Sequence, residues 1–106
     1  MFLVLWEFEV KPGHEQRFER VYGPGGDWEA LFRRDPNHTS TCLYRDATKP
    51  GVYLTADSWR SRKSYEDFHK SRKTEYESLD AACEELTTSE RHIGSYEAIG
   101  AACVGL

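Results

Sequence analysis

One histidine and its neighbours are the residues of this sequence whose types and spacing suit chemistry on a small molecule. His69 lies in a stretch, residues 58–86, whose apolar side chains recur every three or four positions. An imidazole takes up and releases a proton near neutral pH. Tyr65 and Tyr76 add hydroxyl donors, and Arg72 adds a cation that can stabilise an anion. These types permit proton transfer combined with stabilisation of a negative charge.

The same residues also have structural interpretations. His69 could be a hydrogen-bonded histidine at the boundary of the core. Because Phe68 and His69 are adjacent on a helix, their side chains point about 100° apart and cannot both face one pocket squarely. Arg72 could pair with Glu75 on the helix surface. Trp59 could serve only to pack the corner between a strand and a helix.

The stretch around His69, residues 58–86, predicts one long amphipathic helix, with Ser58 and Ser61 as candidate N-caps. It contains neither Pro nor Gly, and its apolar positions fall on one face at about 3.6 residues per turn. Charged residues fill the positions between them, as on a solvated face. The apolar face comprises Tyr65, Phe68, the stem of Arg72, Tyr76, Leu79, Cys83 and Leu86. Such a face must be buried against another layer of the protein.

Four segments have the patterns of β-strands and supply that layer. Residues 2–11 alternate with period two, and one face of this segment is wholly apolar. That face comprises Phe2, Val4, Trp6, Phe8 and Val10. Residues 39–46 and 52–59 flank the turn Lys49-Pro50-Gly51 and predict a hairpin. Residues 92–99 are the fourth predicted strand, with Gly94 as a potential bulge.

Two short helices, residues 14–22 and 28–34, complete the order β-α-(α)-β-β-α-β. With right-handed crossovers, this order predicts an α+β fold, the ferredoxin-like βαββαβ plait, with a four-stranded antiparallel sheet and helices on one face. We expect one domain over residues 1–100 and a C-terminal tail over residues 101–106. The uncovered sheet face is partly apolar and predicts a homodimer packed sheet to sheet.

Composition excludes several classes of function. A net charge of −4 with mixed signs argues against nucleic-acid binding. Nothing predicts a membrane span, a signal peptide, a nucleotide-binding loop, or a flavin or metal signature. The cysteines Cys42, Cys83 and Cys103 are odd in number and widely spaced, which disfavours a zinc site and a disulfide framework. We therefore expect a cytoplasmic protein without a cofactor.

Several segments together resemble the antibiotic biosynthesis monooxygenase (ABM) family of dimeric α+β barrels. They are the strand ending in VKPG, the segment YGPGGDWEALFRRDPN, the hairpin strand YLTADSW and the helix SYEDFHKSRKTEYESL. The resemblance covers about residues 2–99. It implies a homodimer with a pocket in each subunit between the helices and the inner sheet face. The family includes cofactor-independent oxygenases of polyketide anthrones and quinols, haem-degrading enzymes, isomerases, and members without a known activity.

The resemblance does not extend to the residues of haem degradation. The haem-degrading members use an Asn on the first strand, with a Trp and a His on the long helix. This sequence has Trp6 or Glu7 in place of the Asn, and Phe68 in place of the Trp. Ser78 or Leu79 stands where those enzymes have the His.

The resemblance instead implies binding of an aromatic or polycyclic small molecule and its oxygenation without a cofactor. In that reaction a phenol or anthrone loses a proton, and its anion passes an electron directly to dioxygen. His69 is then the candidate base, and Arg72 and Tyr65 stabilise the anion. Apolar walls keep the pocket dry. The candidate substrate-binding residues are Trp6, Phe8, Trp28, Phe32, Trp59, Phe68 and Tyr76.

Two other functions fit the same fold. One is a non-catalytic ligand-binding or stress-response protein. The other is an isomerase or cyclase in which His69 only moves protons. An enclosed pocket with His69 facing it favours chemistry, whereas a pocket filled by Trp6, Trp28 and Phe32 favours a structural or binding role. Oxygen uptake separates the oxygenase from the isomerase.

Overall fold

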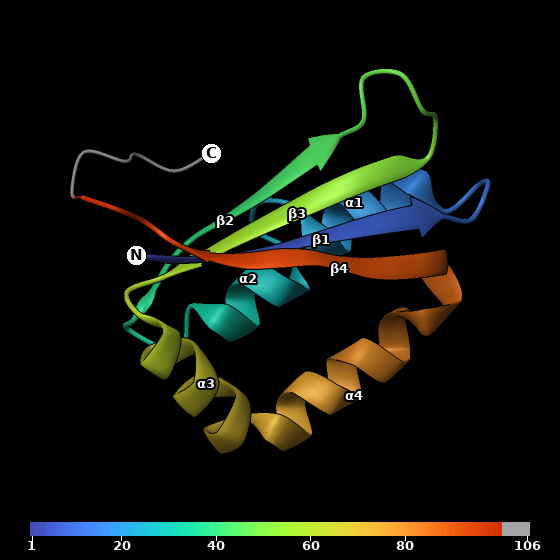
Figure 1. The fold of residues 1–106 in the computed structure, drawn as a ribbon. Coiled ribbons are helices and arrows are strands. Elements are labelled where there is room, and N and C mark those ends of the chain that lie inside the picture. Colours follow the sequence, from blue (N-terminus) through green and yellow to red (C-terminus); the bar gives the residue numbers. More distant parts are fainter. Residues whose placement is uncertain (101–106) are drawn as a thin grey trace.

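A four-stranded antiparallel sheet forms one layer of the molecule (Figure 1). The computed structural model describes residues 1–100. The strands lie in the order β2-β3-β1-β4. Their bounds are Phe2–Val10 for β1, His38–Arg45 for β2, Val52–Trp59 for β3 and Thr87–Glu97 for β4. This is the strand order of a ferredoxin-like plait, so the predicted fold class is confirmed. The predicted tail, residues 101–106, lies outside the described residues.

The helices form the second layer and lie on one face of the sheet (Figure 1). Their bounds are Glu15–Tyr22 for α1, Asp27–Phe32 for α2, Arg62–Ser71 for α3 and Lys73–Cys83 for α4, followed by the 3₁₀ turn η1, Glu84–Leu86. The helix predicted over residues 28–34 is therefore shorter and ends at Phe32. Within residues 1–100, none of the helices combines the length and the hydropathy that a bilayer span requires.

The inner face of the sheet carries the alternating apolar residues predicted for the first strand. β1 lies in the middle of the sheet and pairs with β3 and β4. Phe2, Val4, Phe8 and Val10 are buried, whereas Trp6 is only partly buried. The predicted period of two is thus confirmed, and the exception at Trp6 marks a place where the two layers are not in full contact.

A cluster of aromatic rings joins the sheet to the helices at the end of β3. Trp59 and Phe68 are fully buried, with ring centroids 4.9 Å apart. Phe32 of α2 contacts both rings, at 5.6 Å from Trp59 and 5.5 Å from Phe68. Aromatic pairs at these separations add to the stabilisation from their buried area. This cluster fixes α3 against the sheet.

The prediction of one long helix within residues 58–86 is wrong in its middle. Of the two predicted caps, Ser58 is still part of β3, whereas Ser61 is the N-cap of the helix. At Arg72 the backbone leaves the helical region, with φ −116° and ψ 25°, and this residue separates α3 from α4. Figure 1 shows that the two helices form a wide V beneath the sheet. The break lets α3 follow the aromatic cluster while α4 returns to the start of β4.

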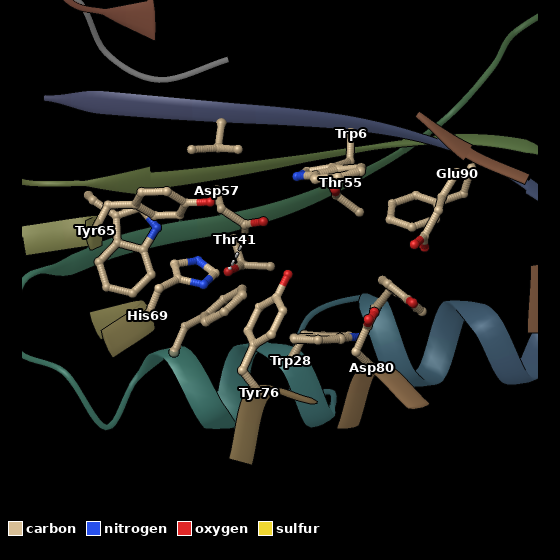
Figure 2. A pocket seen from close by; sticks show the side chains of 15 residues that line it. Trp6, Trp28, Thr41, Thr55, Asp57, Tyr65, His69, Tyr76, Asp80 and Glu90 are labelled. Atoms are coloured by element: carbon tan, nitrogen blue, oxygen red, sulfur yellow. Dashed lines mark hydrogen bonds between the residues drawn. The ribbon is translucent and has the colours of Figure 1, made fainter. Parts of the chain in front are cut away.

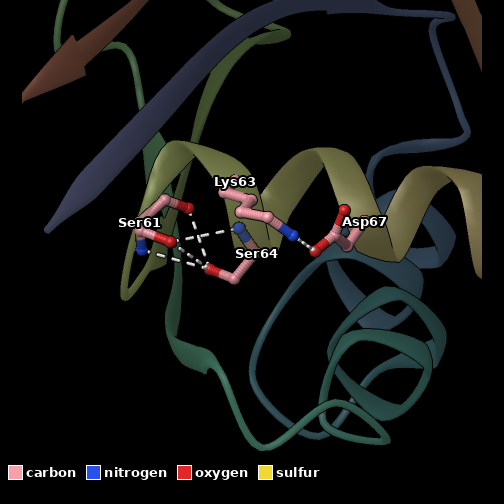
Figure 3. Close-up of polar contacts among 4 residues, drawn as sticks. All are labelled: Ser61, Lys63, Ser64 and Asp67. Carbon is pink, nitrogen blue, oxygen red and sulfur yellow. Dashed lines mark hydrogen bonds and ion pairs between the residues drawn. The ribbon is translucent and has the colours of Figure 1, made fainter.

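A capping box fixes the N-terminus of α3 (Figure 3). The Ser61 hydroxyl accepts a hydrogen bond from the backbone N–H of Ser64 at 3.1 Å. In return, the Ser64 hydroxyl oxygen accepts one from the backbone N–H of Ser61, also at 3.1 Å. These bonds satisfy donors that a helix start leaves without partners. One turn on, Lys63 pairs with Asp67 at 2.6 Å on the exposed side.

The fourth strand is longer than predicted. It begins at Thr87 rather than at residue 92, because Thr87–Glu90 pairs with the end of β1. The register shifts between Leu5, which faces Gly94, and Trp6, which faces His92. The residue between them, Ile93, is therefore extra, which places a bulge beside Gly94 as the sequence predicts. The early start of β4 brings Glu90 to the inner face of the sheet, opposite Phe8.

Candidate functional site

A cavity lies between the inner face of the sheet and the helices (Figure 2). Its interior has a volume of about 60 Å³, and the empty space between its walls, including the open mouth, amounts to about 630 Å³. Many of its wall residues are aromatic, with Trp6 and Phe8 on β1 and Trp28 on α2. Trp6, which is only partly buried, faces this cavity.

Most of the residues predicted to form a site meet in this cavity. The predicted residues that line it are Trp6, Phe8, Trp28, Phe32, Trp59, Tyr65, His69 and Tyr76. They come from two strands and three helices that are distant in sequence. The structure therefore brings together the proton-transfer group, both candidate hydroxyl donors and most of the candidate aromatic walls.

Phe68 and Arg72 do not line the cavity. Phe68 is fully buried in the aromatic cluster described above. The Arg72 guanidinium donates a hydrogen bond to the Glu75 carboxylate at 3.0 Å, and Arg34 lies 3.5 Å from the same oxygen. This arrangement is the surface pairing considered for Arg72 from the sequence. Within residues 1–100, no Lys or Arg side chain lines the cavity.

His69 lies between two tyrosine rings. Its ring centroid is 4.4 Å from that of Tyr65 and 4.6 Å from that of Tyr76. Burial lowers the pKa of His69, so the imidazole is neutral at neutral pH and can accept a proton. Among the described residues, neither ring nitrogen has a hydrogen-bond partner. The ring is thus held by packing alone, and its polar edge is left for a ligand.

The two tyrosines are suited to donate hydrogen bonds into the cavity. Burial raises the pKa of Tyr65 and of Tyr76, so both hydroxyls keep their protons. The nearby charge of Asp57 contributes to the higher pKa of Tyr65. Figure 2 shows the hydroxyl of Tyr76 pointing up from α4 towards the sheet. Neither hydroxyl has a hydrogen-bond partner within the part of the chain that the structure describes.

Asp57 is a wall residue that the sequence analysis missed. It lies on β3 opposite Val4 on one side and Thr41 on the other. The Thr41 hydroxyl donates a hydrogen bond to the Asp57 carboxylate at 2.7 Å. Burial raises the pKa of Asp57 to about 6. The sequence did contain a signal for Asp57. In the predicted strand it shares the inward face with Thr55 and Trp59, where a charged residue is unexpected.

Two further carboxyl groups, Asp80 and Glu90, line the opposite end of the cavity. Burial raises the pKa of both, and nearby negative charges act in the same direction: that of Glu84 on Asp80, and those of Asp80 and Glu84 on Glu90. The sequence offered a signal for Asp80, because it follows Tyr76 by one helical turn and shares its face. It offered none for Glu90, whose inward position depends on the early start of β4. The cavity as a whole is aromatic and acidic.

No set of three or more His, Cys, Asp or Glu side chains within residues 1–100 is arranged to hold a metal ion.

Comparison with known proteins places this fold among related chains. The sequence profile of the family described as antibiotic biosynthesis monooxygenase matches residues 1–76. Among curated protein sequences, no significant match is found. Solved structures give many matches, three of which illustrate the relationship.

One similar structure is a putative antibiotic biosynthesis monooxygenase from Deinococcus radiodurans, with a TM-score of 0.76, 15% identity, and coverage of 99% of each chain. Another is a putative antibiotic biosynthesis monooxygenase from Bordetella bronchiseptica, with a TM-score of 0.74, 18% identity, and coverage of 92% of this chain and 96% of that one. A third is SnoaB, described as a cofactor-independent oxygenase from Streptomyces nogalater, with a TM-score of 0.69, 18% identity and 95% coverage of each chain. At these identities the likeness establishes the fold.

Proposed function

The chain belongs to the antibiotic biosynthesis monooxygenase family, and from that premise we propose that it binds an aromatic small molecule in the cavity and oxygenates it without a cofactor. The observation that carries this proposal is the cavity itself. Its aromatic walls suit a planar ring, and His69, Tyr65 and Tyr76 present polar groups to it that have no partners within residues 1–100. Structural similarity to a cofactor-independent oxygenase supports the same reaction class.

The reaction converts an activated CH₂ group and dioxygen into a carbonyl group and water. The substrate, an anthrone, loses a proton from this CH₂ group to a base in the cavity, for which His69 is one candidate. The carbanion gives one electron to O₂. The resulting substrate radical and superoxide then combine through a C–O bond to form a peroxide. Loss of water from the hydroperoxide leaves one oxygen atom in the product. Tyr65 and Tyr76 donate hydrogen bonds to the oxygen of the anion, and the aromatic walls limit access of water.

The dimensions of the cavity suggest how a substrate binds. Ligand sites usually enclose about 300–1,000 Å³, whereas the interior here is about 60 Å³. A cavity that takes one benzene ring has about 150 Å³, so the proposed substrate occupies the open mouth as well as the interior. Trp6, from the sheet side, and Trp28, from the helix side, flank such a ligand.

Oxygen consumption tests the proposed reaction. The purified, metal-free protein is assayed against a panel of anthrones and dihydroquinones, beside a His69→Ala variant. Uptake above the spontaneous rate supports the oxygenase, and a fall in the variant identifies His69 as a participant. Oxygen uptake that is unchanged in the variant supports the oxygenase function and excludes a role for His69 in the reaction. Ligand binding without uptake favours the binding protein or the isomerase.

A homodimer belongs to the same proposal. The sheet face opposite the helices carries Leu3, Leu5 and Leu54, which are only partly buried, and Tyr96, which is 49% exposed. An apolar sheet face of this kind is typical of an interface between subunits. Light scattering that gives the mass of a single chain at micromolar concentration would contradict the dimer. Cys42 and Cys83 are free thiols, which suits the cytoplasmic location that we propose.

A further inference from the structure

Four side chains that can accept a proton line the cavity: His69 and Asp57, with Asp80 and Glu90 at the opposite end. His69 and Asp57 differ in how they are held. His69 is positioned by ring packing, and within residues 1–100 it has no hydrogen bond that would fix which nitrogen carries the proton. Asp57 is oriented by a hydrogen bond from Thr41. A base works best when its lone pair is aimed before the substrate arrives.

The hydrogen bond to Asp57 is the last of a short chain. The Thr41 hydroxyl oxygen lies 2.7 Å from Asp57 Oδ1 and 2.9 Å from His38 Nε2. A hydroxyl has one hydrogen, and the carboxylate needs it; the lone pair of Thr41 must therefore accept from an N–H at Nε2. The His38 ring is in turn packed against Trp59, with centroids 5.2 Å apart, and Phe32, at 5.6 Å.

The second carboxylate oxygen of Asp57 is left for the cavity. Among the described residues, Oδ2 accepts no hydrogen bond. Figure 2 shows Asp57 on the ceiling of the cavity, with His69 and Tyr76 below it and Tyr65 beside it. The other charged groups of the cavity, Asp80 on α4 and Glu90 on β4, line the same walls without a compensating cation. A carboxylate placed in this way attracts a hydroxyl hydrogen.

We propose that Asp57 is the proton acceptor of this site, and that Thr41 and His38 are positioning residues behind it. The inference rests on the proposed oxygenase function. Its electrostatics are consistent with that role, because burial leaves Asp57 ionised at neutral pH yet more basic than an ordinary aspartate. The substrate enters neutral, since the acidic cavity would repel an anion.

The protons and electrons balance with dioxygen as the oxidant. Asp57 Oδ2 takes the first proton, and the negative charge moves from the carboxylate to the substrate. The substrate anion gives one electron to O₂, and the two radicals join through a C–O bond. Asp57 returns its proton to the terminal peroxide oxygen. The regenerated carboxylate then removes the second C–H proton as the O–O bond breaks. The departing hydroxide takes that proton and leaves as water.

The pH dependence of oxygen uptake from 1,8-dihydroxyanthrone, corrected for the spontaneous rate, tests this assignment. We expect Asp57→Asn to lower kcat/KM by about 10²–10⁴-fold. Thr41→Val removes a hydrogen bond that favours the carboxylate and therefore raises the pKa of Asp57. The fall in the rate of oxygen uptake at low pH should then begin at a higher pH than in the wild type, while the rate at high pH changes little. Asp67→Asn, on the exposed side of α3, is the matched control and should behave as the wild type.

Two outcomes would overturn the assignment while leaving the oxygenase intact. One is an Asp57→Asn variant within threefold of the wild type. The other is a Thr41→Val variant whose rate falls equally at every pH, which indicates a purely structural role. His69 also faces the cavity and could cause the fall in rate at low pH. If Asp57 causes it, the fall must persist in a His69→Gln variant.

A binding measurement tests Asp57 apart from oxygenation. The non-oxidisable phenol 1,8-dihydroxyanthraquinone is titrated while tryptophan fluorescence is followed, since Trp6, Trp28 and Trp59 all line the cavity. We expect affinity to rise with pH through the titration of Asp57, and this rise to disappear in Asp57→Asn. A rise that is unchanged in the variant overturns the inference. A wild-type protein that neither binds this phenol nor consumes oxygen contradicts the proposed function and the inference with it.

Discussion

Replacing Asp57 by Asn should stabilise the folded protein above pH 6. The pKa of Asp57 is raised from 3.8 to about 6 by burial. Folding therefore favours the protonated carboxyl group, and the free energy of unfolding falls as pH rises through this range. A difference of about two pKa units corresponds to about 3 kcal/mol. The Asn variant has no charge to bury, and its amide oxygen can still accept the hydrogen bond from Thr41.

The predicted difference depends on pH, which separates it from an ordinary packing effect. At pH 8 we expect Asp57→Asn to exceed the wild type by up to about 3 kcal/mol in free energy of unfolding. At pH 4, where the carboxyl group is largely protonated in the folded state, the two proteins should differ by less than about 1 kcal/mol. Urea unfolding followed by circular dichroism at pH 4, 6 and 8 measures both values.

The control for this experiment is Asp67→Asn. Asp67 pairs with Lys63 on the exposed side of α3, and such pairs contribute about 0–1 kcal/mol. Its effect should be small at all three pH values. The reasoning is refuted if Asp57→Asn is less stable than the wild type at pH 8, or if its gain is the same at pH 4 and pH 8. A gain in stability accompanied by lost oxygen uptake would be the expected trade between stability and function.

Further variants test the core, the helix start and the dimer. Phe68→Ala should lower the free energy of unfolding by about 3–5 kcal/mol, because the ring is fully buried beneath Trp59; a urea midpoint near that of the wild type would contradict this. Ser61→Ala should cost about 1 kcal/mol through loss of the capping box, visible as a lower Tm, with Ser61→Asp as the control that keeps a cap. Leu54→Lys should shift the protein from the proposed dimer to a monomer in sedimentation velocity, and a wild-type sedimentation coefficient in this variant would argue against the sheet-to-sheet interface.

The sheet was predictable because its central strand has a strong pattern. β1 alternates over its whole length, and each inward residue except Trp6 is buried. The hairpin of β2 and β3 was equally legible from the turn at Lys49-Pro50-Gly51. The sequence predicts β4 too short, because its first residues, Thr87–Glu90, are polar and their pairing with β1 depends on the tertiary fold. An edge strand that is mostly exposed has little hydrophobic pattern to detect.

The break at Arg72 could not be predicted from the sequence. No Gly or Pro lies near it, and the apolar spacing continues from Phe68 to Tyr76 without interruption. The break follows from two distant requirements: Phe68 must reach the aromatic cluster, and α4 must return to β4. Tertiary packing of this kind overrides local helix propensity. Because Arg72 lies at the break, its side chain meets Glu75 and not the cavity.

The site was predictable in its aromatic part and not in its acidic part. Trp6, His69 and Tyr76 stand out by residue type. Asp57 and Glu90 become wall residues only when strand registers are known, because a carboxylate on a strand reads by default as solvent-exposed. A charged residue at an inward position of a strand is nonetheless rare. Such an exception to the hydrophobic pattern is expected mainly at functional sites.

The broken helix divides the chain into parts that can evolve at different speeds. Each helix buries one residue, but α3 buries the large ring of Phe68, whereas α4 buries the small side chain of Cys83. Yet α4 supplies Tyr76 and Asp80 to the cavity. Substitutions along α4 can therefore reshape the ligand site at little risk to folding, while those in α3 are held back by the core. A family with one scaffold and many substrates would diversify most easily along such a helix.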